Sequence, residues 1–237
     1  MRQVPLPLVA QAVATFDSFI TGCNERLVSQ LRADVPPRSP VYVWGPSGSG
    51  KTHLLRALRH ACEAVGARVA TWGPLDARGG AVFEGGVRLL ILDDVHLLQP
   101  PAQHTAFGLL VEAQAQGVPW AAAGPLPPVD LPLREDLRTR LGWGQVHAVE
   151  PLSEVQTRQA LRTEAERRGM VLGDEVLDYL LSRFARDLGH LMQLLDRLDD
   201  YALSRARPVT VPLLRQMLAE EPVAPEQELQ AGLELGT

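Results

Sequence analysis

The sequence lacks the features that mark disulfide-rich, membrane-spanning or nucleic-acid-coating proteins. It has only two cysteines, Cys23 and Cys62, which are far apart and lack Cys-x-x-Cys spacing, so a disulfide framework and a zinc ribbon are both disfavoured. No apolar run approaches the roughly 20 residues that cross a bilayer, and the proline-interrupted start lacks the form of a signal peptide. The net charge of −5, from 23 basic and 28 acidic residues, argues against broad phosphate neutralisation along DNA or RNA. We therefore expect a soluble, cytoplasmic protein with no membrane contact.

The pattern of apolar residues divides the chain into four segments. Residues 1–12 form a leader whose prolines disfavour regular structure. Residues 13–149 have the pattern of an α/β domain, and residues 150–220 have the pattern of a smaller helical domain. Residues 221–237 are rich in proline and glutamate and are predicted to be a disordered tail.

Short apolar runs alternate with amphipathic segments in the first of these domains. Continuous apolar runs are typical of strands that are covered on both faces. The predicted strands are 41–44, 68–72, 89–92, 118–122 and 145–149. Helical spacing predicts one helix with an apolar face from Leu54 to Val65, which includes Cys62, and another helix over 103–115. The alternation predicts a mainly parallel sheet with helices on both sides.

The segment after Pro151 changes to helical periodicity alone. Ser153 and Gln156 form a potential capping box that opens a helix, which Gly169 ends. Leucines at helical spacing predict two more helices, the second opened by Asp187, and Thr210 is predicted to cap the last. We expect a small all-helical domain here.

A phosphate-binding loop is the strongest motif in the chain. The segment matches G-x-x-x-x-G-K-[ST] at every fixed position and lies between a predicted strand and a predicted helix. Its glycines let backbone N–H groups turn toward phosphate, Lys51 can reach the β- and γ-phosphates, and Thr52 can hold Mg²⁺. The predicted ligand is ADP or ATP. The predicted nucleotide-binding residues are Gly45, Pro46, Ser47, Gly48, Ser49, Gly50, Lys51, Thr52 and His53.

Two carboxylates follow the predicted strand 89–92. Asp93 is predicted to help hold Mg²⁺ through its water shell, and Asp94 to orient the attacking water. Two acids after a strand also suit a solvated turn or a helix cap. The neighbouring phosphate loop favours the catalytic interpretation.

Together these motifs resemble the DnaA-type AAA+ family. The resemblance covers about residues 13–220 and includes the phosphate loop, Leu-Asp-Asp-Val-His from residue 92, the Asp-Leu-Arg-Thr-Arg box at 136–140 and a helical lid. The segment Phe-Asp-Ser-Phe at 16–19 is similar to the one that flanks the nucleotide base in that family. We expect the chain to lack the family's N-terminal interaction domain and its DNA-binding helix-turn-helix domain, for which residues 1–12 and 221–237 leave no room.

The start of the chain narrows the resemblance to the regulatory inactivators of DnaA. Its residues fit Q-x-x-L-P-L, the form of a peptide that docks on the bacterial sliding clamp, through Gln3, Leu6, Pro7 and Leu8. The resemblance implies a negative regulator of replication initiation that binds DnaA and the clamp, contacts DNA only through the clamp and forms a possible homodimer. It also implies that Arg140 acts as an arginine finger on the ATP of DnaA. From charge alone, Arg140 is a helix-end residue paired with Glu135 or Asp136.

Two departures from the family pattern bear on the protein's own ATPase activity. Ala123 occupies the place of a polar residue that contacts the γ-phosphate, and Gly189 occupies the place of a lid arginine. We expect nucleotide to be held with little or no hydrolysis by this chain itself. Two alternatives stay open: a P-loop small-molecule kinase, and an ATPase acting on DNA in the manner of DnaA or a helicase loader.

Overall fold

The computed structural model describes residues 13–74, 86–184 and 187–220. The predictions for the leader 1–12, for the tail 221–237 and for the clamp-binding residues therefore lie outside the described residues. The chain forms two compact units, which divide between Leu152 and Ser153.

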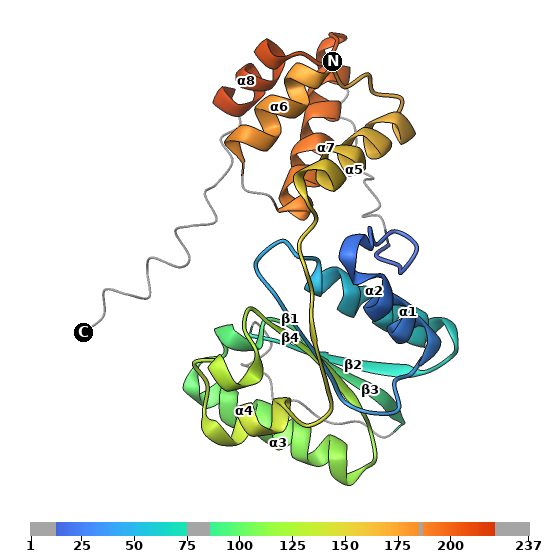
Figure 1. Ribbon diagram of the computed structural model, residues 1–237, viewed down its shortest axis with the longest axis vertical. Helices are drawn as coiled ribbons and strands as arrows, with labels where there is room; N and C mark the ends of the chain where they lie inside the picture. Colours follow the sequence, from blue (N-terminus) through green and yellow to red (C-terminus); the bar gives the residue numbers. More distant parts are fainter. Residues whose placement is uncertain (1–12, 75–85, 185–186, 221–237) are drawn as a thin grey trace, which may run out of the picture. The chain divides into compact units, whose positions relative to one another are not determined.

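The first unit is built on a parallel sheet (Figure 1). Within the described residues, five strands lie in the order β2-β3-β4-β1-β5, and every neighbouring pair is parallel. The strands are β1 (Val41–Trp44), β2 (Arg68–Trp72), β3 (Val87–Leu92), β4 (Trp120–Gly124) and β5 (Gln145–Ala148). The predicted fold class is confirmed.

One strand lies two residues further along the chain than the apolar run indicates. Val118 and Pro119 precede β4, because the Val118 N–H group donates to the Ala113 carbonyl at 2.8 Å and closes the turn after a helix. The strand extends instead through Gly124, where its pairing with β1 ends.

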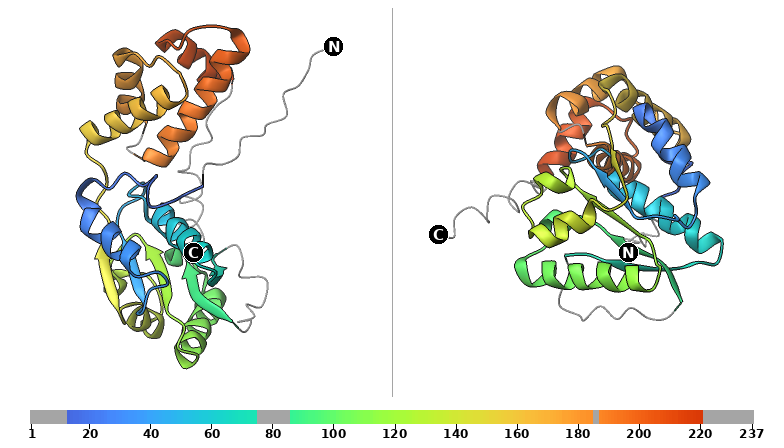
Figure 2. Two further views of the ribbon diagram at one scale, coloured as in Figure 1. Left: turned by 90° about the vertical axis from the view of Figure 1, so that its right-hand side faces the viewer. Right: turned by 60° about the horizontal axis from the view of Figure 1, so that its bottom comes forward.

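Helices cover both faces of the sheet (Figures 1 and 2). One face packs on α1 (Glu25–Ala33) and α2 (Lys51–Ala64), and the other on α3 (Pro100–Ala115) and α4 (Glu135–Leu141). Alternate strand residues serve the two cores, since side chains point to opposite sides of a strand. The first core takes Val41, Val43, Leu89, Ile91, Ala121 and Ala123, and the second takes Tyr42, Leu90, Leu92, Trp120 and Ala122.

The predicted apolar face of α2 is confirmed for the residues from Leu54 to Cys62 and wrong for Val65. Leu54, Leu58 and Cys62 are buried in the first core. Burial raises the pKa of the Cys62 thiol to about 11, which leaves it unreactive. Val65 is 64% exposed, because the helix ends at Ala64 and Val65 lies in the turn that follows.

The second unit is an all-helical domain of α5 (Glu154–Arg167), α6 (Asp174–Arg183), α7 (Leu188–Arg205) and α8 (Val211–Glu220). The predicted capping box is present: the Ser153 hydroxyl accepts from the Gln156 N–H group, and the Gln156 side chain accepts from the Ser153 N–H group. The Asp187 side chain caps α7. The four helices bury a shared core that includes Leu161, Leu177 and Leu195. Among the described helices, none is long and apolar enough to span a bilayer.

Candidate functional site

The candidate nucleotide site lies at the carboxyl edge of the sheet. All strands run in one direction, so the residues that follow β1, β3 and β4 meet at one edge. Because β4 lies between β1 and β3, its carboxyl end lies between the strand that leads into the phosphate loop and the strand that leads to Asp93. The Gly45 N–H group donates to the Gly124 carbonyl at 3.3 Å and joins the loop to this strand end.

Lys51 lies folded into the phosphate loop. Its side chain is buried, with 8% of the residue exposed, and its ammonium donates to the Gly45 and Pro46 carbonyls at 2.8 Å each. The Ser49 hydroxyl is also buried, and it has no hydrogen-bond partner among the described residues. A buried ammonium and an unsatisfied hydroxyl inside one loop fit a phosphate group, which accepts hydrogen bonds from both.

The glycines of the loop are required by close approach of other atoms. A Cβ atom at Gly50 would lie 2.6 Å from the Phe19 ring, and its backbone φ is +95°. A Cβ atom at Gly45 would lie 2.3 Å from the Val149 carbonyl oxygen. The loop therefore has no room for side chains where its backbone passes these residues, as a phosphate cradle requires.

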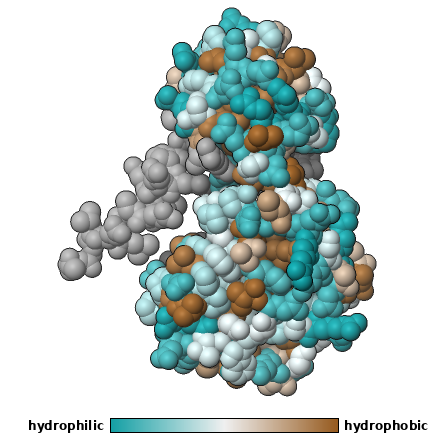
Figure 3. Space-filling view, in the orientation of Figure 1, coloured by the Kyte–Doolittle hydropathy of each residue, from teal (hydrophilic) through white to brown (hydrophobic). Residues whose placement is uncertain are grey.

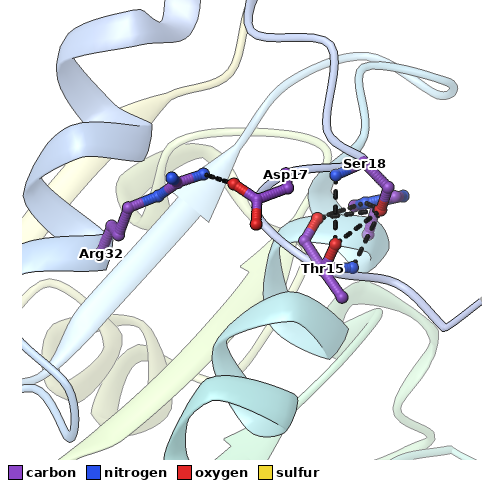
Figure 4. A network of polar contacts seen from close by, with 5 residues as sticks. Thr15, Asp17, Ser18 and Arg32 are labelled. Atoms are coloured by element: carbon purple, nitrogen blue, oxygen red, sulfur yellow. Dashed lines mark hydrogen bonds and ion pairs between the residues drawn. The ribbon is translucent and has the colours of Figure 1, made fainter.

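His53 lies in the first turn of α2, and its ring contacts the segment before α1, whose residues Thr15, Asp17 and Ser18 are shown in Figure 4. Its Nε2 atom is 3.1 Å from the Thr15 carbonyl oxygen and 3.2 Å from the Ser18 hydroxyl, and its ring centroid is 5.5 Å from that of Phe19. Burial lowers the pKa of His53. The segment that resembled the base-flanking part of the family is thus attached to the phosphate loop. An ion pair of 2.9 Å between Asp17 and Arg32 joins the same segment to α1.

The two predicted carboxylates lie side by side after β3. Burial raises the pKa of Asp93, and the Asp94 carboxylate raises it further, while a hydrogen bond from the Thr52 side chain lowers it. Asp94 has a left-handed backbone, with φ of 47°. Thr52 and Asp93 together offer the hydroxyl and carboxylate oxygens that suit Mg²⁺ in a P-loop protein. Within the described residues no group of three or more His, Cys, Asp or Glu could hold a metal.

The two residues that depart from the family pattern lie in β4 and at the start of α7. Ala123 is fully buried in β4 on the α2 side of the sheet, and its methyl group cannot form a hydrogen bond. Gly189 lies in the first turn of α7, where its N–H group donates to the Asp187 carboxylate at 2.8 Å. Neither residue brings a polar side chain toward a phosphate.

Arg140 lies at the surface of the first unit, in the last turn of α4. Its guanidinium carbon is 4.2 Å from the centroid of the Trp143 ring and 5.6 Å from that of Phe107, and its Nη1 atom donates to the Gln114 side chain. Arg140 thus lies at a helix end, as the charge-based alternative expects, but its printed hydrogen bond is to Gln114, and Asp136 pairs instead with Arg134 at 2.7 Å. A surface hollow of about 640 Å³ lies here, lined by Phe107, Arg134, Glu135, Asp136, Thr139, Arg140 and Trp143.

The sequence motifs gave no indication of the α3 residues beside Arg140. Gln114 is 26 positions away in the chain, and Phe107 lies within an apolar run of its helix. A pattern of residues along the chain does not contain such a contact, because it depends on how α3 packs against α4.

Comparisons with known proteins agree with this architecture. A family profile described as "Bacterial DnaA ATPAse domain" matches residues 10–70, and one described as "Hda, lid domain" matches residues 154–218. A Haemophilus influenzae protein described as uncharacterized is 32% identical over 228 residues, which cover 92% of this chain and 98% of that protein.

Solved structures of similar fold include domain III of the Thermotoga maritima replication initiation protein DnaA. It has a TM-score of 0.73 and 20% identity, over 88% of this chain and 97% of that one. DnaA from Aquifex aeolicus with AMPPCP bound has a TM-score of 0.64 and 23% identity, over 82% and 68% of the two chains. The Thermotoga maritima RuvB branch migration motor has a TM-score of 0.58 and 15% identity, over 83% and 68%.

The parallel sheet, the phosphate loop on β1 and the helical second unit define an AAA+ fold, whose P-loop implies nucleotide binding. With the lid match, the full-length relative and the DnaA-type fold taken together, the chain belongs to the DnaA family as an Hda-like protein.

Proposed function

We propose that this protein is a negative regulator of replication initiation that stimulates ATP hydrolysis by the initiator DnaA. The observation that carries the proposal is the place of Arg140, which belongs to the Asp-Leu-Arg-Thr-Arg box and lies at the surface beside an open hollow. The lid match supports the same assignment, since it is to the Hda branch of the family.

Arginine suits the proposed role for chemical reasons. Its charge is permanent, and its planar fork of N–H groups can bridge two phosphate oxygens. Supplied to the ATP of DnaA, the charge of Arg140 would stabilise the phosphoryl-transfer transition state, and an arginine of this kind raises hydrolysis by a factor of roughly 10³–10⁵. DnaA would be left in its ADP form.

The chain's own nucleotide has a structural role in this proposal. Lys51, Ser49 and Thr52 would bind ADP or ATP, and Thr52 and Asp93 would hold the Mg²⁺ ion. Ala123 and Gly189 provide no polar side chain to contact a γ-phosphate. Even with Asp94 placed to orient a water molecule, this chain would therefore hydrolyse ATP slowly. We expect turnover of ATP by the purified protein alone to be far below one per second, on the low side of the usual enzyme range. Several turnovers per second without DnaA would contradict this.

The sliding clamp is the second proposed partner, bound through Gln3, Leu6, Pro7 and Leu8. Burial of each leucine stabilises a complex by roughly 1.5–3 kcal/mol before association costs are subtracted, so the peptide alone would bind weakly. A clamp that encircles DNA and offers several binding sites would strengthen the interaction through effective concentration. Contact with DNA would be indirect, through the clamp.

Reconstitution with DNA-loaded clamp and ATP-bound DnaA tests the proposal. The measurement is the rate at which DnaA-bound ATP becomes ADP, with wild type, Arg140→Ala and the double variant Gln3→Ala/Leu6→Ala. Both variants should lose most of the stimulation. Arg59→Ala is the matched control, since Arg59 is a half-exposed arginine on α2 paired with Glu63.

Each alternative function has its own signature in these assays. Full stimulation by Arg140→Ala would remove the arginine finger from the proposal. Phosphoryl transfer from ATP to a small-molecule acceptor would favour a kinase. ATP-dependent, salt-sensitive binding to single-stranded DNA would favour a DnaA-like or loader-like ATPase.

A further inference from the structure

We propose that Trp143 and Gln114 are positioning residues that hold the Arg140 guanidinium ready for a phosphate of the partner. This inference rests on the proposed function, in which Arg140 acts on DnaA-bound ATP. It adds an account of how the guanidinium of this arginine is held in place for that task.

Two helices and the turn that follows one of them meet around the guanidinium. Phe107 and Gln114 come from α3, Arg140 comes from α4, and Trp143 lies in the turn after α4, two residues beyond its end. The Trp143 ring lies closest, with its centroid 4.2 Å from the guanidinium carbon. The Gln114 side-chain oxygen accepts from Arg140 Nη1.

The backbone fixes the place of the Trp143 ring on both sides. On the α4 side of the ring, the Trp143 N–H group donates to the Arg140 carbonyl at 3.0 Å, and the Gly142 N–H group donates to the Arg138 carbonyl at 3.1 Å. After Trp143, Gly144 has a φ of +147°, and a Cβ atom there would lie 2.3 Å from the Pro40 carbonyl oxygen. The Gln145 N–H group also donates to the Pro40 carbonyl at 2.9 Å, so the backbone on both sides of Trp143 is hydrogen-bonded and holds this residue at the end of α4, beside Arg140.

Trp143 has no comparable role in either core of the first unit. It is 49% exposed, whereas Trp72 and Trp120 are 5% and 2% exposed and belong to the core on the α3 side. Exposed hydrophobic side chains on the face shown in Figure 3 form small groups among hydrophilic ones. Leaving half of a tryptophan ring in water is unfavourable, because apolar ring surface stays hydrated. The cation–π interaction with the guanidinium offsets part of this free-energy cost.

In this arrangement, N–H groups of the Arg140 guanidinium remain available for hydrogen bonds to a phosphate. The contact with Trp143 is a cation–π attraction between the guanidinium, whose carbon lies 4.2 Å from the ring centroid, and the ring, whereas hydrogen bonds to phosphate use the guanidinium N–H groups. Gln114 takes one of the five N–H donors of the guanidinium, so the others remain for phosphate oxygens. Gln114 is also neutral, so it orients the guanidinium without cancelling its charge.

The test is the same DnaA hydrolysis assay, measured as a function of the concentration of this protein. A group that acts only in the transition state changes the maximal rate more than the half-saturating concentration. We expect Trp143→Ala to lower the maximal stimulated rate by about five- to twentyfold, with the half-saturating concentration within about twofold of wild type. Trp143→Phe should restore the rate to within about threefold, because a phenyl face also attracts the cation.

Gln114→Glu provides an independent variant with the opposite effect on the contact. A carboxylate at 114 would hold the arginine more firmly, and it would neutralise the charge that the phosphate needs. We expect an unchanged or higher melting temperature together with a maximal rate lowered by about tenfold. Gln114→Met, which keeps the size and removes the acceptor, should lower the rate by only about two- to threefold.

A spectroscopic measurement tests the stack without any partner. Acrylamide should quench the tryptophan fluorescence of Arg140→Ala more strongly than that of wild type, and this difference should vanish when Trp143→Phe is added to both proteins. Equal quenching of wild type and Arg140→Ala would show that the stack does not exist in solution.

The outcomes separate this inference from the proposed function. Unchanged stimulation by Arg140→Ala would remove the proposed function itself. Loss of stimulation in Arg140→Ala, with a full maximal rate in Trp143→Ala, would overturn only the positioning role. A higher half-saturating concentration at a full maximal rate in Trp143→Ala would also overturn it, since Trp143 would then be a docking contact.

Discussion

A side chain at Gly124 would collide with a buried hydroxyl group. A Cβ atom there would lie 2.2 Å from the Tyr42 oxygen, which donates to the Leu126 carbonyl at 2.9 Å. Tyr42 is fully buried, so its hydroxyl cannot avoid the new methyl group by turning into solvent. We expect Gly124→Ala to lower the free energy of unfolding by about 1–3 kcal/mol in chemical denaturation.

The double variant with Tyr42→Phe identifies the cause. Without the hydroxyl, the next nearest atom to the new methyl group is the Tyr42 ring carbon Cζ at 3.3 Å. Tyr42→Phe alone should cost about 1 kcal/mol through its lost hydrogen bond. The double variant should be more stable than the sum of the single losses predicts, and strict additivity would show that the clash is not responsible.

Lys51 is the residue on which nucleotide affinity depends most directly. Its ammonium already occupies the loop, where it bonds to the Gly45 and Pro46 carbonyls, so it is placed before a phosphate arrives. We expect Lys51→Ala to weaken ADP binding by about 10- to 100-fold in isothermal titration calorimetry, the equivalent of one charge-assisted contact. Arg59→Ala on the outer face of α2 should bind ADP like wild type, and an equal loss in both variants would point to a general charge effect.

At the scale of elements, α5 of the lid domain carries a pH-sensitive group of ion pairs, formed by Glu164 with Arg167 and Arg168. Hydrogen bonds from Arg167 and Arg168 lower the pKa of Glu164 to about 2. The unfolded-state pKa is about 4.3, so the folded state favours the charged form. The resulting stability is present above the unfolded pKa and is lost as pH falls through the folded one.

Glu164→Gln tests this contribution. We expect a loss of about 1–2 kcal/mol in the free energy of unfolding at pH 7, after allowance for solvent screening, and the difference from wild type should close between about pH 5 and pH 2. Glu166→Gln, an exposed change on the same helix, serves as the control. A difference that stays constant with pH would rule out the ionised carboxylate as its source.

The elements that were predicted accurately are those whose signals are local. Strands 41–44 and 68–72 and the Ser153 capping box agree with the structure, because each depends on residues adjacent in sequence. The predicted start of β4 and the predicted place of Val65 on an apolar helix face were wrong, since both depend on where a helix ends. The phosphate loop was evident from its motif, whereas the surroundings of Arg140 required the packing of α3 on α4.

At the scale of the whole molecule, each unit has a core of its own. The core of the second unit is formed from its own helices, with Leu161, Leu177 and Leu195 among its buried residues. We therefore expect a fragment of residues 153–220 to fold in isolation, with helical circular dichroism and a cooperative thermal transition. Isolated helices of this length are marginal in water, so a broad and gradual loss of signal would show that the fragment lacks a packed core.

The parallel sheet also gives the first unit two chemically different ends. The strand amino ends gather opposite the phosphate loop, and the residues that lead into β1 lie there. Arg38 is one of them, with a side chain that is 94% exposed. A dye or a biotin attached at this position, once the exposed Cys23 is replaced, would immobilise or track single molecules from the end of the sheet that lies opposite the phosphate loop.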